Sequence, residues 1–310
     1  MSANIAFVFP GQGSQSVGML AELGANHRVV VETFSQASQV LGYDLWQLVQ
    51  HDQSGLLNQT HVTQPALLSA GVALWRLWLE KGGRTPTMLA GHSLGEYSAL
   101  VCAGALNFSD AIRLVEARGQ FMQAAVPPGE GAMAAIIGLD NDAIALACEV
   151  SAQGQTVAPV NYNSPGQVVI AGSKLAVERA MVACKAGGAK RALALPVSVP
   201  SHCSLMLPAA EKLRTILAGV KMSLPIIPVV HNVDAKLASS SEAIISNLVA
   251  QLHQPVLWTQ CVESIAASGV DLVVECGPGK VLNGLTKRIN KTLQSASIND
   301  AASLAATLKH

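Results

Sequence analysis

The stretch "TMLAGHSLGEYSALV" (residues 87–101) joins two apolar runs through a turn that holds one serine between two glycines. Residues 87–92 have the length and composition of a buried strand, and the run after Ser93 is typical of a buried helix. In this context the G-x-S-x-G pattern of residues 91–95 predicts a tight turn that presents the serine at the carboxyl edge of a sheet. The alternative is that Ser93 only caps the helix that begins near Leu94.

The segments on either side of this stretch alternate between strand and helix patterns. A short buried strand is predicted over 5–10 and a helix over 62–83. Further along, the pattern returns with a strand segment at 226–233, a helix near 239–252, a strand segment at 271–279 and a final helix. This alternation predicts a mostly parallel sheet covered on both faces, in an α/β-hydrolase-like core.

The stretch from 132 to 197 has a different order of elements and predicts a domain of its own. Its segments read strand, helix, strand, strand, helix, strand, over 132–139, 140–151, 156–163, 167–172, 173–186 and 191–197. The order βαββαβ is that of a ferredoxin-like unit. We therefore expect a small ferredoxin-like domain at 127–197, inserted into a large α/β domain formed by 1–126 and 198–310.

Composition excludes several classes of function. Of the 310 residues, 50% are hydrophobic and 13% charged, and the 20 basic and 20 acidic side chains cancel, so no nucleic-acid or anionic-membrane partner is expected. The six cysteines lack CxxC pairs or ligand-like spacing, which argues against a metal site and a disulfide framework. The first residues show no signal peptide, and no apolar helical stretch is long enough to span a bilayer. These features predict a cytoplasmic protein.

A serine nucleophile needs a base, and His202 is the candidate. It follows an extended segment at a Pro-Ser turn, where active-site loops of α/β sheets collect. His92, next to the serine, is expected to point away from it. The acids between Ser93 and His202, such as Asp110 and Asp140, lie at helix starts, where N-capping explains them. We therefore expect an amide or a backbone carbonyl, rather than a carboxylate, to orient the imidazole.

The loop "FPGQGSQ" (9–15) follows the first strand and holds two glycines. It lacks the third glycine of a dinucleotide loop and the lysine of a Walker loop, so it gives little support to phosphate binding. A loop of this kind can bring the backbone N–H near Gln12 to the serine turn and complete an oxyanion hole. A plain glycine turn explains the pattern equally well.

Arg118 interrupts the apolar face of a predicted helix. At 100° per residue, Leu114, Val115 and Met122 share one face of the segment 108–125, and Arg118 falls in the middle of that face. A buried guanidinium without an anionic partner is unfavourable by several kcal/mol. Arg118 should therefore meet either an internal carboxylate or an anionic ligand, and in the second case the substrate carries a carboxylate.

Five segments in order carry a resemblance to a known family. They are "FPGQGSQ", "GHSLGEYSAL", Arg118, "VSVPSH" and "ECGPGKVL". Together they resemble the malonyl-CoA:acyl carrier protein transacylases of bacterial type II fatty acid synthesis, over essentially the whole chain. The resemblance implies that Ser93 is acylated, that His202 is the base, and that backbone N–H groups of Gln12 and Leu94 bind the oxyanion.

The resemblance also implies a substrate and a reaction sequence. Arg118 would bind the malonyl carboxylate, and Gln251 would support His202 through its carbonyl. The other pocket residues implied are Gln64, Met122, Met133 and Asn163. Malonyl would pass from coenzyme A to Ser93 and then to the phosphopantetheine thiol of acyl carrier protein, in a ping-pong reaction without a bound cofactor. A monomer is expected.

Acyl carrier proteins of this kind are acidic, so a basic docking patch is expected. On the last predicted helix, Lys280, Lys287 and Lys291 fall on one face at 100° per residue and so form one stripe beside the "GPG" loop, although a solvated face explains them equally well. Two other functions stay open at this point. A serine hydrolase would release the acyl group to water, and a catalytically silent carrier-binding protein would form no adduct.

Overall fold

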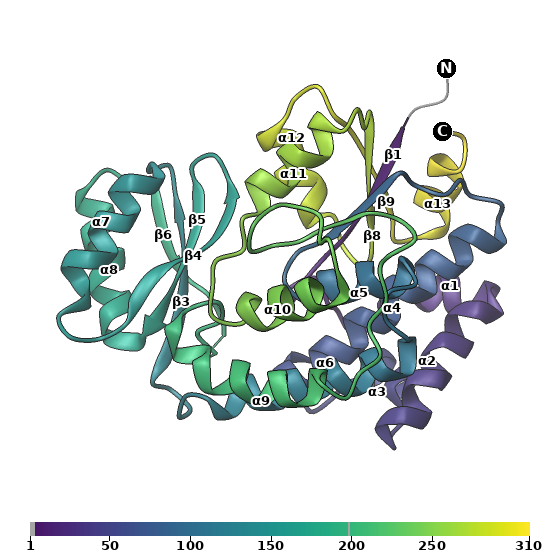
Figure 1. Ribbon diagram of the computed structural model, residues 1–310, viewed down its shortest axis with the longest axis horizontal. Coiled ribbons are helices and arrows are strands. Elements are labelled where there is room, and N and C mark those ends of the chain that lie inside the picture. Colours follow the sequence, from purple (N-terminus) through teal and green to yellow (C-terminus); the bar gives the residue numbers. More distant parts are fainter. Residues whose placement is uncertain (1–3, 198) are drawn as a thin grey trace.

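The computed structural model describes residues 4–197 and 199–310, which form a mixed α/β structure with two separate sheets (Figure 1). Ser198, inside the "VSVPSH" segment and at the expected domain boundary, lies outside the described residues. One sheet is parallel, with strand order β7-β2-β1-β8-β9. The other is antiparallel, with order β4-β5-β3-β6.

Four strands of the parallel sheet, all except β9, are buried along their whole length, which explains why they are apolar rather than alternating. In β1, Phe7 and Phe9 pack into the larger core, whereas Ala6 and Val8 face a second core on the opposite side. The ring of Phe7 meets that of Trp75 edge-on, with centroids 5.6 Å apart. The strands are β7 (Val229–Val230), β2 (Met88–Gly91), β1 (Ile5–Phe9), β8 (Leu272–Cys276) and β9 (Gln294–Ile298).

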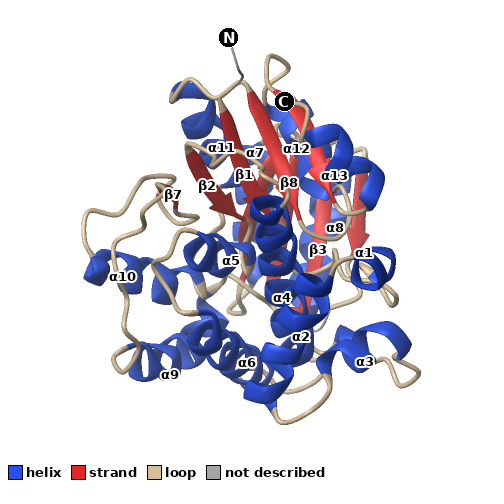
Figure 2. Cartoon of the chain, turned by 90° about the vertical axis from the view of Figure 1, so that its right-hand side faces the viewer, coloured by secondary structure: helices blue, strands red, loops and turns tan. Residues whose placement is uncertain are grey.

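Helices cover both faces of this sheet (Figure 2). The larger core includes residues of α1 (Ala21–Asn26), α2 (Arg28–Leu41), α3 (Leu45–His51), α4 (Thr60–Glu80), α5 (Gly95–Cys102), α6 (Phe108–Ala124), α9 (Leu207–Leu217), α10 (Ser241–Gln251) and α13 (Ala301–Thr307). The second core includes residues of α11 (Trp258–Ala267) and α12 (Val281–Ile289). In the described part of the chain, no helix is long and apolar enough to cross a membrane.

The antiparallel sheet lies beside the parallel one and forms a unit with its own core (Figure 1). Its elements follow the chain as β3 (Gly131–Ile137), α7 (Asn141–Ala152), β4 (Val157–Ser164), β5 (Gln167–Ser173), α8 (Lys174–Ala186) and β6 (Arg191–Ala194). The two helices cover one face of the sheet. On the other face Met133, Val160 and Val169 pack with Cys203, which belongs to the segment leading into α9.

Two strand segments are shorter than the sequence pattern predicts. The segment 226–233 contributes only Val229–Val230, because Pro228 before them cannot donate a backbone hydrogen bond and His231 after them begins a turn, with its N–H donating to Lys236 O. In the small unit, β6 ends at Ala194, two residues before Pro196.

The prediction of one final helix that carries a lysine stripe is wrong. Helix α12 ends at Ile289, and Asn290 is extended (φ −139°, ψ 112°), with its side chain accepting hydrogen bonds from the backbone and hydroxyl of Thr292. Lys280 precedes the helix and Lys291 lies beyond it, so only Lys287 is on the helix. Strand β9 and helix α13 follow, and the sequence pattern missed β9 because its residues are mostly small and polar.

Candidate active site

Close backbone packing forms the turn that carries Ser93, between β2 and α5. An ideal Cβ on Gly91 would lie 1.9 Å from the backbone carbon of Gly95, and one on Gly95 would lie 2.0 Å from the carbonyl oxygen of Phe9. Both positions therefore require glycine. Ser93 itself adopts a left-handed φ of 51°, which a non-glycine residue rarely does without surrounding support. Ser93 precedes the helix cap, which is Leu94, so capping does not explain the serine.

Ser93 and His202 form a hydrogen-bonded pair although they are 109 residues apart. The distance from Ser93 Oγ to His202 Nε2 is 2.8 Å. On its other side, His202 Nδ1 lies 2.6 Å from the backbone carbonyl oxygen of Gln251, at the end of α10. A carbonyl only accepts, so Nδ1 carries the proton and Nε2 is free to accept from the Ser93 hydroxyl. This arrangement gives the serine a base, with a main-chain carbonyl in the place where a triad has its acid.

The environment of His202 keeps its imidazole neutral. Burial, and next the positive charge of Arg118, lower the pKa of His202 to about 3, against the opposing effect of the hydrogen bond to the Gln251 carbonyl. Only 3% of the residue is exposed. The imidazole is therefore in its proton-accepting form throughout the neutral and mildly acidic range.

Arg118 on α6 is 1% exposed and reaches the same serine. Its guanidinium donates to the side-chain oxygens of Gln64 at 2.8 Å and Gln251 at 2.9 Å, and it lies 3.4 Å from Ser93 Oγ. Among the described residues no carboxylate pairs with it within 4 Å. The internal ion pair left open by the sequence is therefore not formed, and the cation is held by neutral amides next to the nucleophile.

One cavity contains most of the predicted site residues. Gln12, Gln64, Leu94, Met122 and Met133 line it together with Ser93, Arg118 and His202. Its other lining residues were not predicted from the sequence pattern; they are His92, Asn161, Leu195, Val197, Val199 and Ser201. The loop that carries Gln12 packs directly on the serine turn, because an ideal Cβ on Gly11 would lie 2.6 Å from the carbonyl oxygen of His92.

The expectation that Asn163 lines this cavity is wrong. His92 does line it, with its ring tilted against Trp258 at a centroid distance of 5.4 Å. Asn163 is not a lining residue, and Asn161 lines the cavity instead. The side-chain oxygen of Asn163 lies 2.8 Å from His92 Nε2, so Asn163 contacts the site only through that ring. The pairing of β4 is irregular, with register shifts on both sides of Asn161. The alternation of residues along the strand therefore cannot predict which asparagine faces the cavity.

Comparisons with known proteins place the chain in a family. The family model described as "Acyl transferase domain" matches residues 6–310. The malonyl CoA-acyl carrier protein transacylase of Salmonella typhimurium is 64% identical over 303 residues, which cover 98% of each chain. The chain belongs to this transacylase family. The Escherichia coli K12 member is 62% identical over 304 residues, again covering 98% of each chain.

Solved structures of transacylases have the same fold. An acyl carrier protein S-malonyltransferase from Vibrio cholerae superposes with a TM-score of 0.96, at 61% identity, over 98% of this chain and 99% of the other. A malonyl-transacylase solved in complex with a type II PKS acyl-carrier protein superposes with a TM-score of 0.98, at 62% identity, over 99% of each chain.

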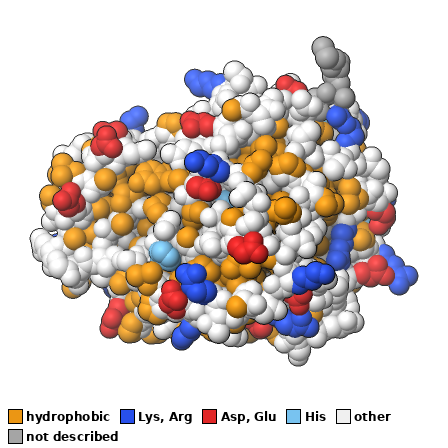
Figure 3. All heavy atoms as spheres, in the orientation of Figure 1, with side chains coloured by type: hydrophobic (Ala, Val, Ile, Leu, Met, Phe, Trp, Pro, Cys, Tyr) orange, Lys and Arg blue, Asp and Glu red, His pale blue; other side chains and the backbone are white. Residues whose placement is uncertain are grey.

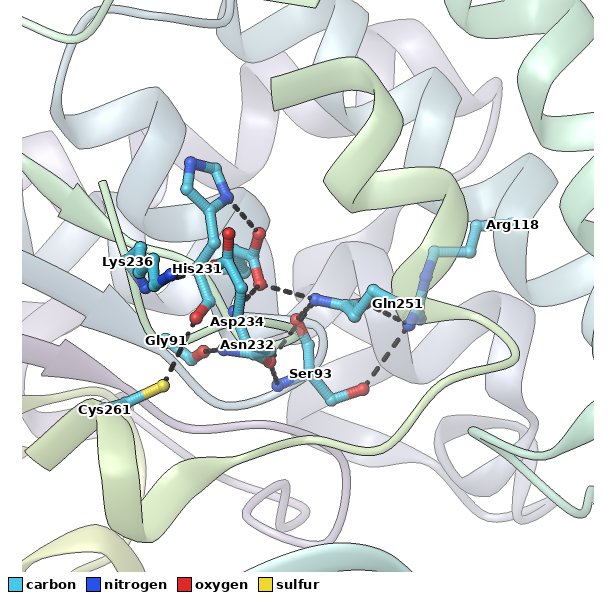
Figure 4. A network of polar contacts seen from close by, with 10 residues as sticks. Gly91, Ser93, Arg118, His231, Asn232, Asp234, Lys236, Gln251 and Cys261 are labelled. Carbon is cyan, nitrogen blue, oxygen red and sulfur yellow. Dashed lines mark hydrogen bonds and ion pairs between the residues drawn. The ribbon is translucent and has the colours of Figure 1, made fainter. Parts of the chain in front are cut away.

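In this transacylase, a buried polar network that the sequence pattern does not indicate lies behind the nucleophile. Asn232 accepts a hydrogen bond from Ser93 N at 2.7 Å and donates to Gly91 O at 2.7 Å, so it holds both sides of the serine turn. Figure 4 shows Gln251 between Arg118 on one side and Asn232 and His231 on the other. Nothing in the local pattern around residue 232 marks it, because its partners are 139 residues away in the chain.

Proposed function

We propose that the protein transfers a malonyl group from malonyl-CoA to the phosphopantetheine thiol of acyl carrier protein, through a malonyl ester on Ser93. The choice of malonyl rests on one observation. The buried Arg118 guanidinium lies 3.4 Å from Ser93 Oγ and has no carboxylate partner among the described residues. A carboxylate on the acyl group would pair with it. The names of the similar proteins support the same substrate.

In the first half-reaction, the Ser93 oxygen attacks the thioester carbonyl while its proton passes to Nε2 of His202, 2.8 Å away. The negative charge that develops on the carbonyl oxygen is stabilised by backbone N–H groups, for which we propose Gln12 and Leu94, both at the cavity. When the carbon–sulfur bond breaks, His202 returns the proton to the leaving sulfur, and coenzyme A departs as the thiol.

The second half-reaction runs the same steps with a new nucleophile. The phosphopantetheine thiol gives its proton to His202 and attacks the ester carbonyl, and the proton then returns to Ser93. Throughout, the Gln251 carbonyl keeps the proton on Nδ1 of His202, so Nε2 is always the nitrogen that exchanges protons. Arg118 holds the carboxylate and hence the ester in place for the incoming thiol.

Intact-mass spectrometry after mixing with malonyl-CoA tests this function. We expect a persistent adduct of one malonyl group, which disappears when holo acyl carrier protein is added and malonyl-carrier forms. A serine hydrolase would instead give free malonate with no lasting adduct, and a silent carrier-binding protein would bind the carrier without any adduct. Either result would contradict the proposal.

The pH dependence of Ser93 reactivity tests the proposed base. A histidine with the ordinary pKa of about 6.5 would be roughly 97% protonated at pH 5, and serine reactivity would fall about 30-fold from its value at pH 8. Because the pKa of His202 is lowered to about 3, we expect the rate of fluorophosphonate labelling to change less than about twofold over this range. A tenfold fall between pH 8 and pH 5 would contradict the neutral imidazole.

The finer description of the fold is also a proposal. We infer an α/β-hydrolase-like large domain, 1–126 and 198–310, with a ferredoxin-like domain at 127–197. The order β3-α7-β4-β5-α8-β6 and the strand order β4-β5-β3-β6 support the second assignment.

We further propose a cytoplasmic monomer without a bound cofactor; the six free, buried cysteines support the reducing compartment. Acidic and basic side chains are interspersed on the face shown in Figure 3. Lys280, Lys287 and Lys291 are all exposed and stay candidates for carrier docking as separate cations at and around α12.

A further inference from the structure

The proposed mechanism gives no role to Glu96, a carboxylate at the start of α5 and three residues beyond the nucleophile. It is 0% exposed. Its Oε1 accepts from Nδ1 of His231 at 2.7 Å, and its Oε2 accepts from the backbone N–H of Asn232 at 3.0 Å and from Nε2 of Gln251 at 2.9 Å. A buried carboxylate is unfavourable unless it is paired and hydrogen-bonded, and every one of these partners lies in a segment that reaches the active site.

The contacts of Gln251 show what Glu96 determines. The Nε2 of Gln251 faces two groups that can only accept, Glu96 Oε2 at 2.9 Å and the backbone oxygen of Ser93 at 3.0 Å. The amide nitrogen must therefore point to that side, and the amide oxygen points to the other. There it accepts from the Arg118 guanidinium at 2.9 Å. With the amide reversed, two donors would face each other at Arg118.

The second contact of the same carboxylate oxygen supports the serine turn. Asn232, whose backbone N–H donates to Glu96, accepts from Ser93 N and donates to Gly91 O through its side chain. Glu96 thus holds two residues in place. Asn232 supports the left-handed conformation of Ser93, and Gln251 accepts from Arg118 beside it.

We propose that Glu96 is a positioning residue that orients the Gln251 amide toward Arg118 and thereby sets the preference for acyl groups with a free carboxylate. The inference rests on the proposed malonyl transfer. Glu96 acts through the direction of its two acceptor oxygens, because it contacts neither the nucleophile side chain nor the guanidinium directly.

Two conservative substitutions separate acceptor geometry from charge. In Glu96→Gln, the new amide oxygen can accept from Asn232 and Gln251 while its nitrogen donates to Nδ1 of His231. For Nδ1 of His231 to accept this hydrogen bond, the imidazole proton must move to Nε2. Among the described residues, no hydrogen-bond partner of Nε2 prevents that tautomer. In Glu96→Asp, the charge stays but the side chain is one methylene shorter, so the contact with Gln251 is lost.

The experiment measures initial rates of Ser93 loading from malonyl-CoA and from acetyl-CoA by intact mass, each divided by the fraction of sites that a fluorophosphonate labels. We expect Glu96→Asp to reduce the malonyl-over-acetyl preference about tenfold, the effect of losing one hydrogen bond to a charged group. We expect Glu96→Gln to stay within about threefold of the wild-type preference, since its contacts are kept.

Glu275→Gln is the matched control, because Glu275 is also 0% exposed and accepts from the backbone N–H of Asn283 at the start of α12. It should lower the melting temperature without changing the acyl preference. A preference unchanged in Glu96→Asp, or reduced equally in Glu96→Gln, would overturn the proposal. Equal loss of both acyl groups per labelled site would also overturn it. Failure of the underlying function would look different, since wild-type protein would be labelled by the fluorophosphonate but would form no malonyl adduct.

Discussion

Replacing Ser93 with Ala is expected to abolish the malonyl adduct and to lower transfer to the carrier by at least about 10³-fold. Among the described residues, the His202 imidazole is hydrogen-bonded to no hydroxyl other than Ser93 Oγ, at 2.8 Å, so none of them is placed to replace it as the nucleophile. The alanine fits the turn without new contacts, so the loss should come from chemistry rather than from folding. Intact mass and a coupled carrier assay measure the two quantities.

Ser98→Ala is the matched control for this prediction. Ser98 is also on the segment that follows the turn and is 2% exposed, but it packs against Gly71 of α4 rather than at the cavity. The control should load malonyl at the wild-type rate. An adduct that persists in Ser93→Ala would mean that another residue carries the acyl group, and peptide mapping would then identify it.

Arg118→Ala is expected to lower the rate of malonyl loading by at least about 100-fold, while acetyl loading is retained or increased. The reason is that a guanidinium can make two charge-assisted hydrogen bonds to a carboxylate, each contributing about 1.5–3 kcal/mol. Acetyl has no carboxylate, and for this group the substitution only removes a polar residue from the cavity wall. Competition between the two thioesters, followed by intact mass, gives the ratio directly.

The control for Arg118 lies on the same helix. Arg113 is exposed, with 62% of its side chain accessible, and pairs with Asp110 at 3.0 Å, so Arg113→Ala removes a cation from α6 without reaching the cavity. Its malonyl-over-acetyl ratio should equal that of the wild type. If Arg118→Ala kept the wild-type ratio as well, the carboxylate would have to be recognised elsewhere.

The local sequence pattern predicted the structure correctly where all of the informative residues lie in one segment. The strand–turn–helix context of Ser93 lies within fifteen residues, and the apolar face around Arg118 lies within one helix, so periodicity alone places Arg118 in the interior. The element order of the small unit could be followed in the same way, because its strands and helices are separated by clear turns.

The parts that the sequence did not predict depend on contacts between distant segments. Asn232 and Glu96 look like ordinary loop and helix residues until the fold brings them together across 136 positions. Strand β9 has little apolar signal because its pairing with β8, rather than its own composition, makes it a strand. The prediction of a lysine stripe was wrong because it extended the helical spacing past Asn290. The helix ends there, since the Asn290 side chain accepts from the backbone of Thr292 and forms a local turn.

Residue 251 orients His202 through its main-chain carbonyl and faces Arg118 through its side chain, so a substitution can change the second role without the first. An acid in a triad is removed by one codon change, whereas a peptide oxygen is present whatever side chain the residue has. Redesign of the acyl range at position 251 can therefore alter the amide that faces Arg118 while the imidazole keeps its tautomer. The corresponding vulnerability is to insertions or deletions between 241 and 252, which would shift the end of α10 and with it the carbonyl that sets the tautomer of the base.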